Sequence, residues 1–178
     1  FTNNNEGVVL VNAHDADLTF DINNNRFFNN LATGASGSAI AADNATTVTP
    51  SATYSGRIRN NTISGGGIDN HLIAILFAGT GNNSLEVTNN NVSAVNSQFS
   101  GLFVQAGETG SGNLSANVTV TGNTVSLGAL GSHGMVIQSR IISTLCAGIS
   151  NNVSSTGGVG LFGINVRQRD ASTFRLPG

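Results

Sequence analysis

Short stretches in which apolar and polar residues alternate recur along the whole chain, separated by segments rich in Gly, Ser, Thr and Asn. The clearest are residues 18–22, 85–87 and 118–120. Alternation with a period of two is typical of a half-buried β-strand. No segment of ten or more residues combines a helical period with capping residues. The pattern therefore predicts an all-β chain of short strands joined by polar loops.

One motif recurs through the chain: an aliphatic residue, any residue, Asn or Gly, Asn, any residue and an apolar residue. Its copies are INNNRF, IRNNTI, VTNNNV and VTGNTV, with a shorter fifth copy, ISNNV. The shared asparagines are Asn25, Asn61, Asn90, Asn123 and Asn152, spaced by 36, 29, 33 and 29 residues. A repeat of roughly 30 residues with short strands and no helix predicts a β-solenoid of about five to six coils. The sequence lacks the leucine spacing of leucine-rich repeats, which excludes that fold. A propeller blade needs four strands in ~40–45 residues, more than the spacing of this repeat holds.

The asparagine column suggests a ladder. Asn tolerates the left-handed conformation of a sharp turn, and stacked amides at the ~4.7–4.8 Å strand spacing can bond to one another. Aligning the repeats places Ile22, Ile58, Val87, Val120 and Ile149 in one inward column. The same alignment places four residues in an outward column: Asp21, Arg57, Glu86 and Thr119.

A second unit, a glycine followed by an apolar run, recurs between these copies. Its glycines are Gly7, Gly37, Gly101, Gly134 and Gly160. In the third repeat, His71 takes the place of the glycine. Each of the two alternating units has the pattern of a short strand.

With these repeats, the chain resembles the right-handed parallel β-helix repeat proteins of the pectate-lyase-like superfamily. It is most similar to the non-catalytic β-helical segments of large bacterial surface and secreted proteins. The resemblance covers residues 5–170 and implies an all-β, right-handed parallel β-helix with Asn-ladder turns. The family includes polysaccharide lyases and hydrolases, phage tailspikes and adhesins. Its fold therefore does not decide the function.

Composition narrows the possible functions. The chain has 178 residues, a length that suits a single domain over residues 1–178, and both ends resemble cuts through a longer polypeptide. Only 9% of residues are charged, the net charge is −2 and there is no lysine, so no basic stripe for nucleic acid exists. No apolar run reaches the ~18 residues of a membrane span. The abundance of Asn, Gly, Ser and Thr favours an extracellular or cell-surface location.

The acidic residues offer one candidate catalytic site. Lyases of the family that the chain resembles hold calcium with several aspartates, but the nine acidic residues here are scattered. The local group is Asp15, Asp17 and Asp21, which suits a paired-carboxylate glycosidase if the carboxyl groups lie ~5–9.5 Å apart. The alternative, which we favour, is a polar loop with Asp21 paired to Arg57.

Metal and cofactor sites are not predicted. His71 and His133 precede equivalent strands, but no third ligand is aligned with them, and the two positions are expected to be one column out of register. The single cysteine, Cys146, permits neither a disulfide framework nor a cysteine metal site within the chain. We therefore expect no bound cofactor and no metal.

Two functions follow as hypotheses. The first is a non-enzymatic structural or adhesive β-solenoid segment, acting as a stalk, adhesin or filament building block. Its partners would be other copies of the chain or neighbouring segments of the same long chain. It would not bind nucleic acid and would not span a membrane. The second is a carbohydrate-active enzyme, a polysaccharide lyase or glycoside hydrolase, or a glycan-binding domain like those of tailspikes.

Overall fold

The computed structural model describes residues 1, 7–12, 16–28, 37–44, 53–65, 71–94, 99–109, 111–128, 133–157 and 162–177. These residues form seventeen β-strands and no helix. The strands belong to three parallel sheets, and each sheet receives every third strand of the chain. The alternating stretches 18–22, 85–87 and 118–120 all lie within strands, as the sequence predicts.

The three sheets are named I, II and III in the order in which the chain visits them. Sheet I contains β1 (Val8–Asn12), β4 (Ile40–Asn44), β7 (Ile73–Phe77), β10 (Leu102–Ala106), β13 (His133–Ser139) and β16 (Phe162–Gln168). Sheet II contains β2 (Leu18–Asn23), β5 (Tyr54–Arg59), β8 (Asn82–Thr88), β11 (Ser115–Thr121), β14 (Thr144–Ser150) and β17 (Thr173–Arg175). Sheet III contains β3 (Arg26–Phe28), β6 (Thr62–Ser64), β9 (Asn91–Ala94), β12 (Thr124–Leu127) and β15 (Val153–Thr156).

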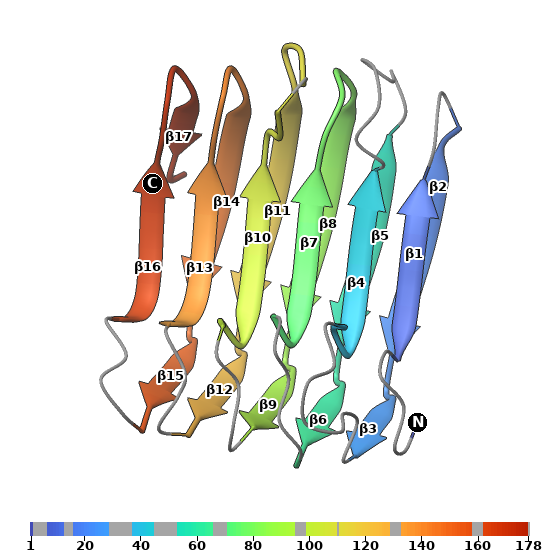
Figure 1. Cartoon of the computed structure of the whole chain (residues 1–178), viewed down its shortest axis with the longest axis vertical. Helices are drawn as coiled ribbons and strands as arrows, with labels where there is room; N and C mark the ends of the chain where they lie inside the picture. The colour runs from blue at the N-terminus through green and yellow to red at the C-terminus, as the bar shows by residue number, and fades with distance from the viewer. Residues whose placement is uncertain are drawn as a thin grey trace.

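All pairings between neighbouring strands are parallel and join one coil to the next, so the molecule is a parallel β-solenoid (Figure 1). Counted as full turns between equivalent residues, from Asn25 to Asn152, the solenoid has about four turns rather than the five to six coils predicted. The reason is that five motif copies enclose only four intervals. Strands β1 and β2 precede these intervals, and β15, β16 and β17 follow them.

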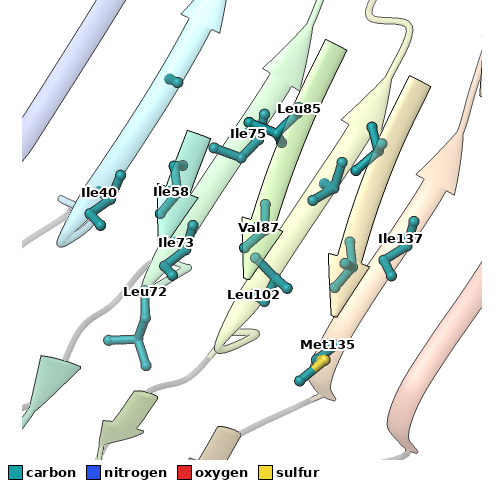
Figure 2. Packing of buried hydrophobic residues seen from close by; sticks show 14 of the residues in the cluster. Ile40, Ile58, Leu72, Ile73, Ile75, Leu85, Val87, Leu102, Met135 and Ile137 are labelled. Atoms are coloured by element: carbon teal, nitrogen blue, oxygen red, sulfur yellow. The ribbon is translucent and has the colours of Figure 1, made fainter. Parts of the chain in front are cut away.

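The core lies between the sheets and is made of matching columns. Figure 2 shows buried side chains from facing strands, including Ile73, Leu102 and Met135 of sheet I and Val87 of sheet II. These four side chains are at most 1% exposed. Each coil can bury its apolar side chains only by stacking on its neighbours, so the core runs along the whole solenoid.

The predicted columns of sheet II are confirmed. Ile22, Ile58, Val87, Val120 and Ile149 pair in register, and the first four are buried. The outward column also has the predicted register, and its members are Asp21, Arg57, Glu86 and Thr119.

The alignment of the glycine units in sheet I is wrong. Pairing of Ile73 with Leu102 places Leu72, not His71, beside Gly101. Gly134 lies beside Gly163 rather than Gly160, because Met135 pairs with Ile164. Loops of different length precede the strands of sheet I, so a glycine next to an apolar run does not fix their register.

Candidate functional site

The predicted asparagine ladder is present and has one repeating geometry. Asn90 illustrates it: its Oδ1 accepts hydrogen bonds from the backbone N of Asn61 (3.0 Å) and from Asn61 Nδ2 (3.0 Å). Its own Nδ2 donates to Asn123 Oδ1 (2.9 Å) and to the carbonyl of Ile58 (2.8 Å). The corresponding bonds link Asn25 to Asn61 and Asn123 to Asn152. Five stacked asparagines therefore join adjacent coils at the corner between sheets II and III.

The left-handed turn belongs to the neighbouring column rather than to the ladder itself. At this corner the residues with positive φ are Asn24, Asn60, Asn89, Gly122 and Asn151. Each of them immediately precedes a ladder asparagine. Asn61, Asn90 and Asn123 are only 1% exposed. The prediction combined two roles in one column, whereas the motif uses one asparagine for the turn and the next for the buried bonds.

The candidate carboxylates are engaged with the next coil. Asp17 Oδ1 accepts hydrogen bonds from the backbone N (2.9 Å) and Oγ1 (2.7 Å) of Thr53, and these bonds lower the pKa of Asp17. Asp21 is bound by Arg59, with Nη2 at 2.6 Å, and this bond lowers its pKa. Asp15 lies outside the described residues. The partner predicted for Asp21 was Arg57, but Arg57 instead contacts Glu86 at 3.2 Å.

Both described carboxylates are held in the ionised form at an exposed face. A general acid needs the opposite, a raised pKa that keeps the proton near neutral pH. Asp17 and Asp21 therefore have the electrostatics of coil-to-coil contacts. Their proposed role as a catalytic pair stays a prediction.

The outer face of sheet II forms a shallow groove of about 760 Å³. One row along it consists of short polar side chains in register, and its members are Thr19, Ser55, Ser84, Asn117 and Cys146. Ser55 Oγ lies 3.1 Å from Ser84 Oγ. The groove offers hydroxyl groups at strand spacing, but its charged side chains bond to one another across coils.

The outer face of sheet I carries a polar row that the sequence alone did not reveal. Its members lie side by side in register, and they are Asp43, Leu76, Gln105, Gln138 and Arg167. Arg167 Nε donates to Gln138 Oε1 (2.6 Å), Gln138 donates in turn to Gln105, and Gln105 Nε2 donates to Glu108 Oε2 (2.5 Å). We call the five residues and Glu108 the sheet I polar row.

The two glutamines at the centre of this row are buried although they face away from the core. Gln105 is 3% exposed and Gln138 is 2% exposed. Buried polar side chains of this kind are costly unless they are hydrogen-bonded, and the bonds above satisfy them. Four members of the row, Arg167, Gln138, Gln105 and Glu108, therefore form a connected polar chain from a guanidinium to a carboxylate.

Asp43 is the least satisfied member of the row. Its Oδ1 is buried and has no hydrogen-bond partner among the described residues. Burial raises the pKa of Asp43, and the nearby charge of Glu108 raises it further. The alternation Ile40–Ala41–Ala42–Asp43 could have placed Asp43 on an outward face, but only the register between coils brings it near Glu108.

The two histidines lie where the strands of sheet I begin, at the opposite end of these strands from the polar row. His71 stacks on Phe103 with ring centroids 4.0 Å apart, and its Nδ1 accepts a hydrogen bond from the backbone N of Ser100 (3.1 Å). Burial lowers the pKa of His71 to about 4. Burial also lowers the pKa of His133, which stacks on Phe162. The register places His71 and His133 in one column, two coils apart, so the predicted one-column offset is wrong.

Within the described ranges, no group of three or more His, Cys, Asp or Glu side chains is arranged to hold a metal ion. No helix long and apolar enough to cross a membrane occurs in that part of the chain. The fold and the ladder define the chain as a parallel β-solenoid with asparagine-ladder corners. No protein-family model, no curated protein and no solved structure matches the chain.

Proposed function

We propose that this chain is a structural or adhesive β-solenoid segment of an extracellular or cell-surface protein. It resembles the β-helical repeats of large bacterial surface proteins within the pectate-lyase-like superfamily. In this role the solenoid provides length and rigidity, as a stalk or filament building block, rather than chemistry.

The observation that carries the proposal is how the polar side chains are used. The ladder asparagines bond coil to coil, and so do the pairs Arg57–Glu86 and Arg59–Asp21. Asp17 likewise reaches the next coil through Thr53. The charged side chains on sheet II that could bind a substrate are therefore engaged between coils, as a rigid spacer requires.

The test combines an assay of polysaccharide turnover with limited proteolysis. A panel of acidic and neutral polysaccharides is incubated with the chain and assayed for new reducing ends and for unsaturated products. We expect no turnover, and we expect limited proteolysis to leave a resistant core that contains β4 to β17. Turnover of any polysaccharide, or rapid cleavage between stacked strands, would overturn the proposal.

A second candidate function, in glycan binding or cleavage, is supported by the sheet I polar row. Burial raises the pKa of Asp43, which is the direction that a general acid requires, and the charge of a second carboxylate, Glu108, raises it further. If the same polysaccharide panel gives turnover or retention, Asp43→Asn should abolish it. Asp17→Asn and Asp21→Asn are the controls and should leave it unchanged. If the Asp43→Asn variant keeps the same turnover or retention, the sheet I polar row is not the site of glycan binding or cleavage.

A further inference from the structure

Three arginines lie together on the outer face of sheet I, where β13 and β16 end. These two strands are neighbours (Figure 1), and Ser139 of β13 pairs with Gln168 of β16. The next residues along the chain, Arg140 and Arg169, are therefore side by side in adjacent coils. The ladder still holds there, since the backbone N of Arg169 donates to the carbonyl of Ser139 (2.9 Å). Because side chains alternate along a strand, Arg167 lies on the same side as Arg169. We call Arg140, Arg167 and Arg169 the arginine cluster.

The three positive charges of the arginine cluster act on one another and are only partly balanced. Burial lowers the pKa of Arg167, and the charges of Arg169 and Arg140 lower it further. Like charges opposite each other on neighbouring strands destabilise a sheet. Within the described part of the chain, one ion pair opposes them, between Arg140 Nε and Asp170 Oδ2 at 3.7 Å. Three arginines and one aspartate leave a net charge of +2 at this place.

The protein leaves guanidinium donors of the cluster without acceptors. Arg140 Nε is buried, yet it has no hydrogen-bond partner among the described residues. Asp170 does not satisfy it at 3.7 Å, and Asp170 Oδ2 already accepts a hydrogen bond from the backbone N of Ile141 (3.1 Å). A buried donor without an acceptor costs free energy, and an acceptor on a ligand would recover that cost.

The sheet I polar row holds Arg167 in place. Arg167 Nε donates to Gln138 Oε1 (2.6 Å), and Gln138 donates in turn to Gln105. Both glutamines are buried, so this chain of bonds is shielded from water. The bond occupies Nε and leaves the two Nη groups of Arg167 as donors. A guanidinium that is already oriented loses less conformational entropy when it binds a ligand.

The arginine cluster belongs to a face of the solenoid rather than to the edge of a sheet. Arg140 has a coil on either side, because its backbone N donates to the carbonyl of Ala106 (2.8 Å) and Arg169 lies beside it in the next coil. A further strand beside β16 would extend sheet I in its own plane and would leave the outer face uncovered. The cluster therefore does not depend on an unpaired strand edge.

A tetrahedral oxyanion matches this arrangement. Guanidinium groups donate paired hydrogen bonds to the oxygens of anions such as carboxylate and phosphate. A carboxylate has only two oxygens, and one arginine can occupy both. A phosphate or sulfate group has more acceptor oxygens, which point in several directions, so arginines from two strands can bind it at once. A divalent oxyanion would also balance the net positive charge of the site.

From these observations we infer that the arginine cluster is a binding site for a tetrahedral oxyanion, a sulfate or phosphate group held by Arg140, Arg167 and Arg169. The group is either a free ion or an ester on a polysaccharide. The inference goes beyond the proposed structural function and does not require that the chain cleaves polysaccharides.

The experiment titrates the chain with sodium sulfate, and separately with sodium phosphate, at an ionic strength kept constant with sodium chloride. NMR follows the Nε–H signals of the arginines. The variants are Arg169→Gln and the double variant Arg140→Gln/Arg169→Gln. Arg26→Gln, in β3, removes the same charge outside the cluster and is the matched control. Circular dichroism and thermal unfolding establish that all three variants fold.

We expect saturable shifts of the arginine signals in the unaltered chain, and the same affinity in Arg26→Gln. Arg169→Gln should weaken binding by about tenfold, the effect of losing a hydrogen bond to a charged group, and the double variant should abolish saturable binding. The inference would be wrong if neither sulfate nor phosphate gave saturable binding to the unaltered chain. It would also be wrong if Arg26→Gln weakened binding as much as Arg169→Gln.

A second measurement identifies the source of the oxyanion. Retention of the chain is compared on immobilised dextran sulfate and on unmodified dextran. An ester on a polysaccharide predicts retention by dextran sulfate alone, kept in Arg26→Gln and lost in the double variant. Saturable sulfate binding without retention supports a site for the free ion. Equal retention of the double variant and the unaltered chain would place the oxyanion elsewhere and overturn the inference. Polysaccharide turnover would overturn the proposed structural function and leave this inference unchanged.

Discussion

The corner between sheets II and III and the outer face of sheet I both contain buried polar side chains but organise them differently. At the corner, one residue type repeats in every coil, and each asparagine makes the same bonds as the one before it. On sheet I, the residue type changes along the column, from Asp43 through Leu76 and two glutamines, Gln105 and Gln138, to Arg167. The corner is a repeated structural unit, and the outer face of sheet I is a unique surface.

The difference arises from the connections. A single left-handed residue, such as Asn89, joins sheet II to each ladder asparagine, so the spacing across the corner is constant in every coil. The segments that lead into sheet I vary in length, and the sheet I strands are free to carry different residues. A solenoid can therefore keep a fixed corner while one face diversifies.

The largest expected effect comes from placing a charge in the core beside the corner. Val87 is fully buried between Ile58 and Val120. We expect Val87→Asp to lower the free energy of unfolding by about 4 kcal/mol or more, because an unpaired carboxylate would be buried. Chemical denaturation measures the change. Glu86→Gln, on the outward side of the same strand, is the control, and an equal loss in both variants would contradict the assignment of the two faces.

The next effect separates the two asparagine columns. Asn90→Ala removes both acceptor bonds of its Oδ1 and leaves the buried backbone N of Asn61 and carbonyl of Ile58 without these partners. We expect a loss of about 3 kcal/mol in the free energy of unfolding. Asn89→Gly should change it little, since Asn89 has a φ of 55° that glycine adopts readily. A larger loss in Asn89→Gly than in Asn90→Ala would mean that the turn, not the ladder, holds the corner.

The corner was largely predictable from sequence because its motif has constant length. The positions of Asn25 through Asn152 and the inward aliphatic column followed directly from the repeat. The separate role of the preceding asparagine could not be deduced, because both residues are Asn in four of the five copies, and only Gly122 breaks the pattern. Glycine at that position is the one signal that the preceding column holds the left-handed residue.

The outer face of sheet I was not predictable for a physical reason. Asp43 and Glu108 are 65 residues apart in the chain and belong to different motif copies. Their proximity depends on the register between coils, and the glycine that precedes each strand does not fix this register. Asp17 and Asp21 are close in sequence and were therefore selected, although the structure pairs them with Thr53 and Arg59.

A smaller effect concerns pH and the sheet I face. The folded chain lowers the pKa of His71 from 6.5 to about 4, so below pH 6.5 the unfolded chain binds the proton more readily. Stability from His71 is therefore complete above pH 6.5 and is lost as the pH falls towards 4. We expect the unaltered chain to lose about 2 kcal/mol more than His71→Asn between pH 8 and pH 5. Parallel pH profiles of unfolding for the two proteins would contradict the burial of the neutral ring.

The smallest effect uses two aspartates whose pKa values shift in opposite directions. Burial raises the pKa of Asp43, so its contribution to stability is present below pH 3.8 and is lost as the pH rises through the folded value. Arg59 lowers the pKa of Asp21, so the contribution of Asp21 is present above pH 3.8 and is lost as the pH falls through its folded value.

At pH 7, Asp43→Asn should therefore raise the melting temperature slightly, and Asp21→Asn should lower it slightly, with both differences disappearing in acid. Differential scanning calorimetry of the two variants and the unaltered chain at pH 7 and pH 3 measures the four differences in melting temperature. A stabilising Asp43→Asn that also keeps the strands intact would show that the carboxylate on sheet I reduces the stability of the fold. Because a solenoid coil needs no charge at that position, such a cost would favour a role for Asp43 in binding rather than in stacking. A destabilising Asp43→Asn would instead make the outer face of sheet I a structural unit like the corner.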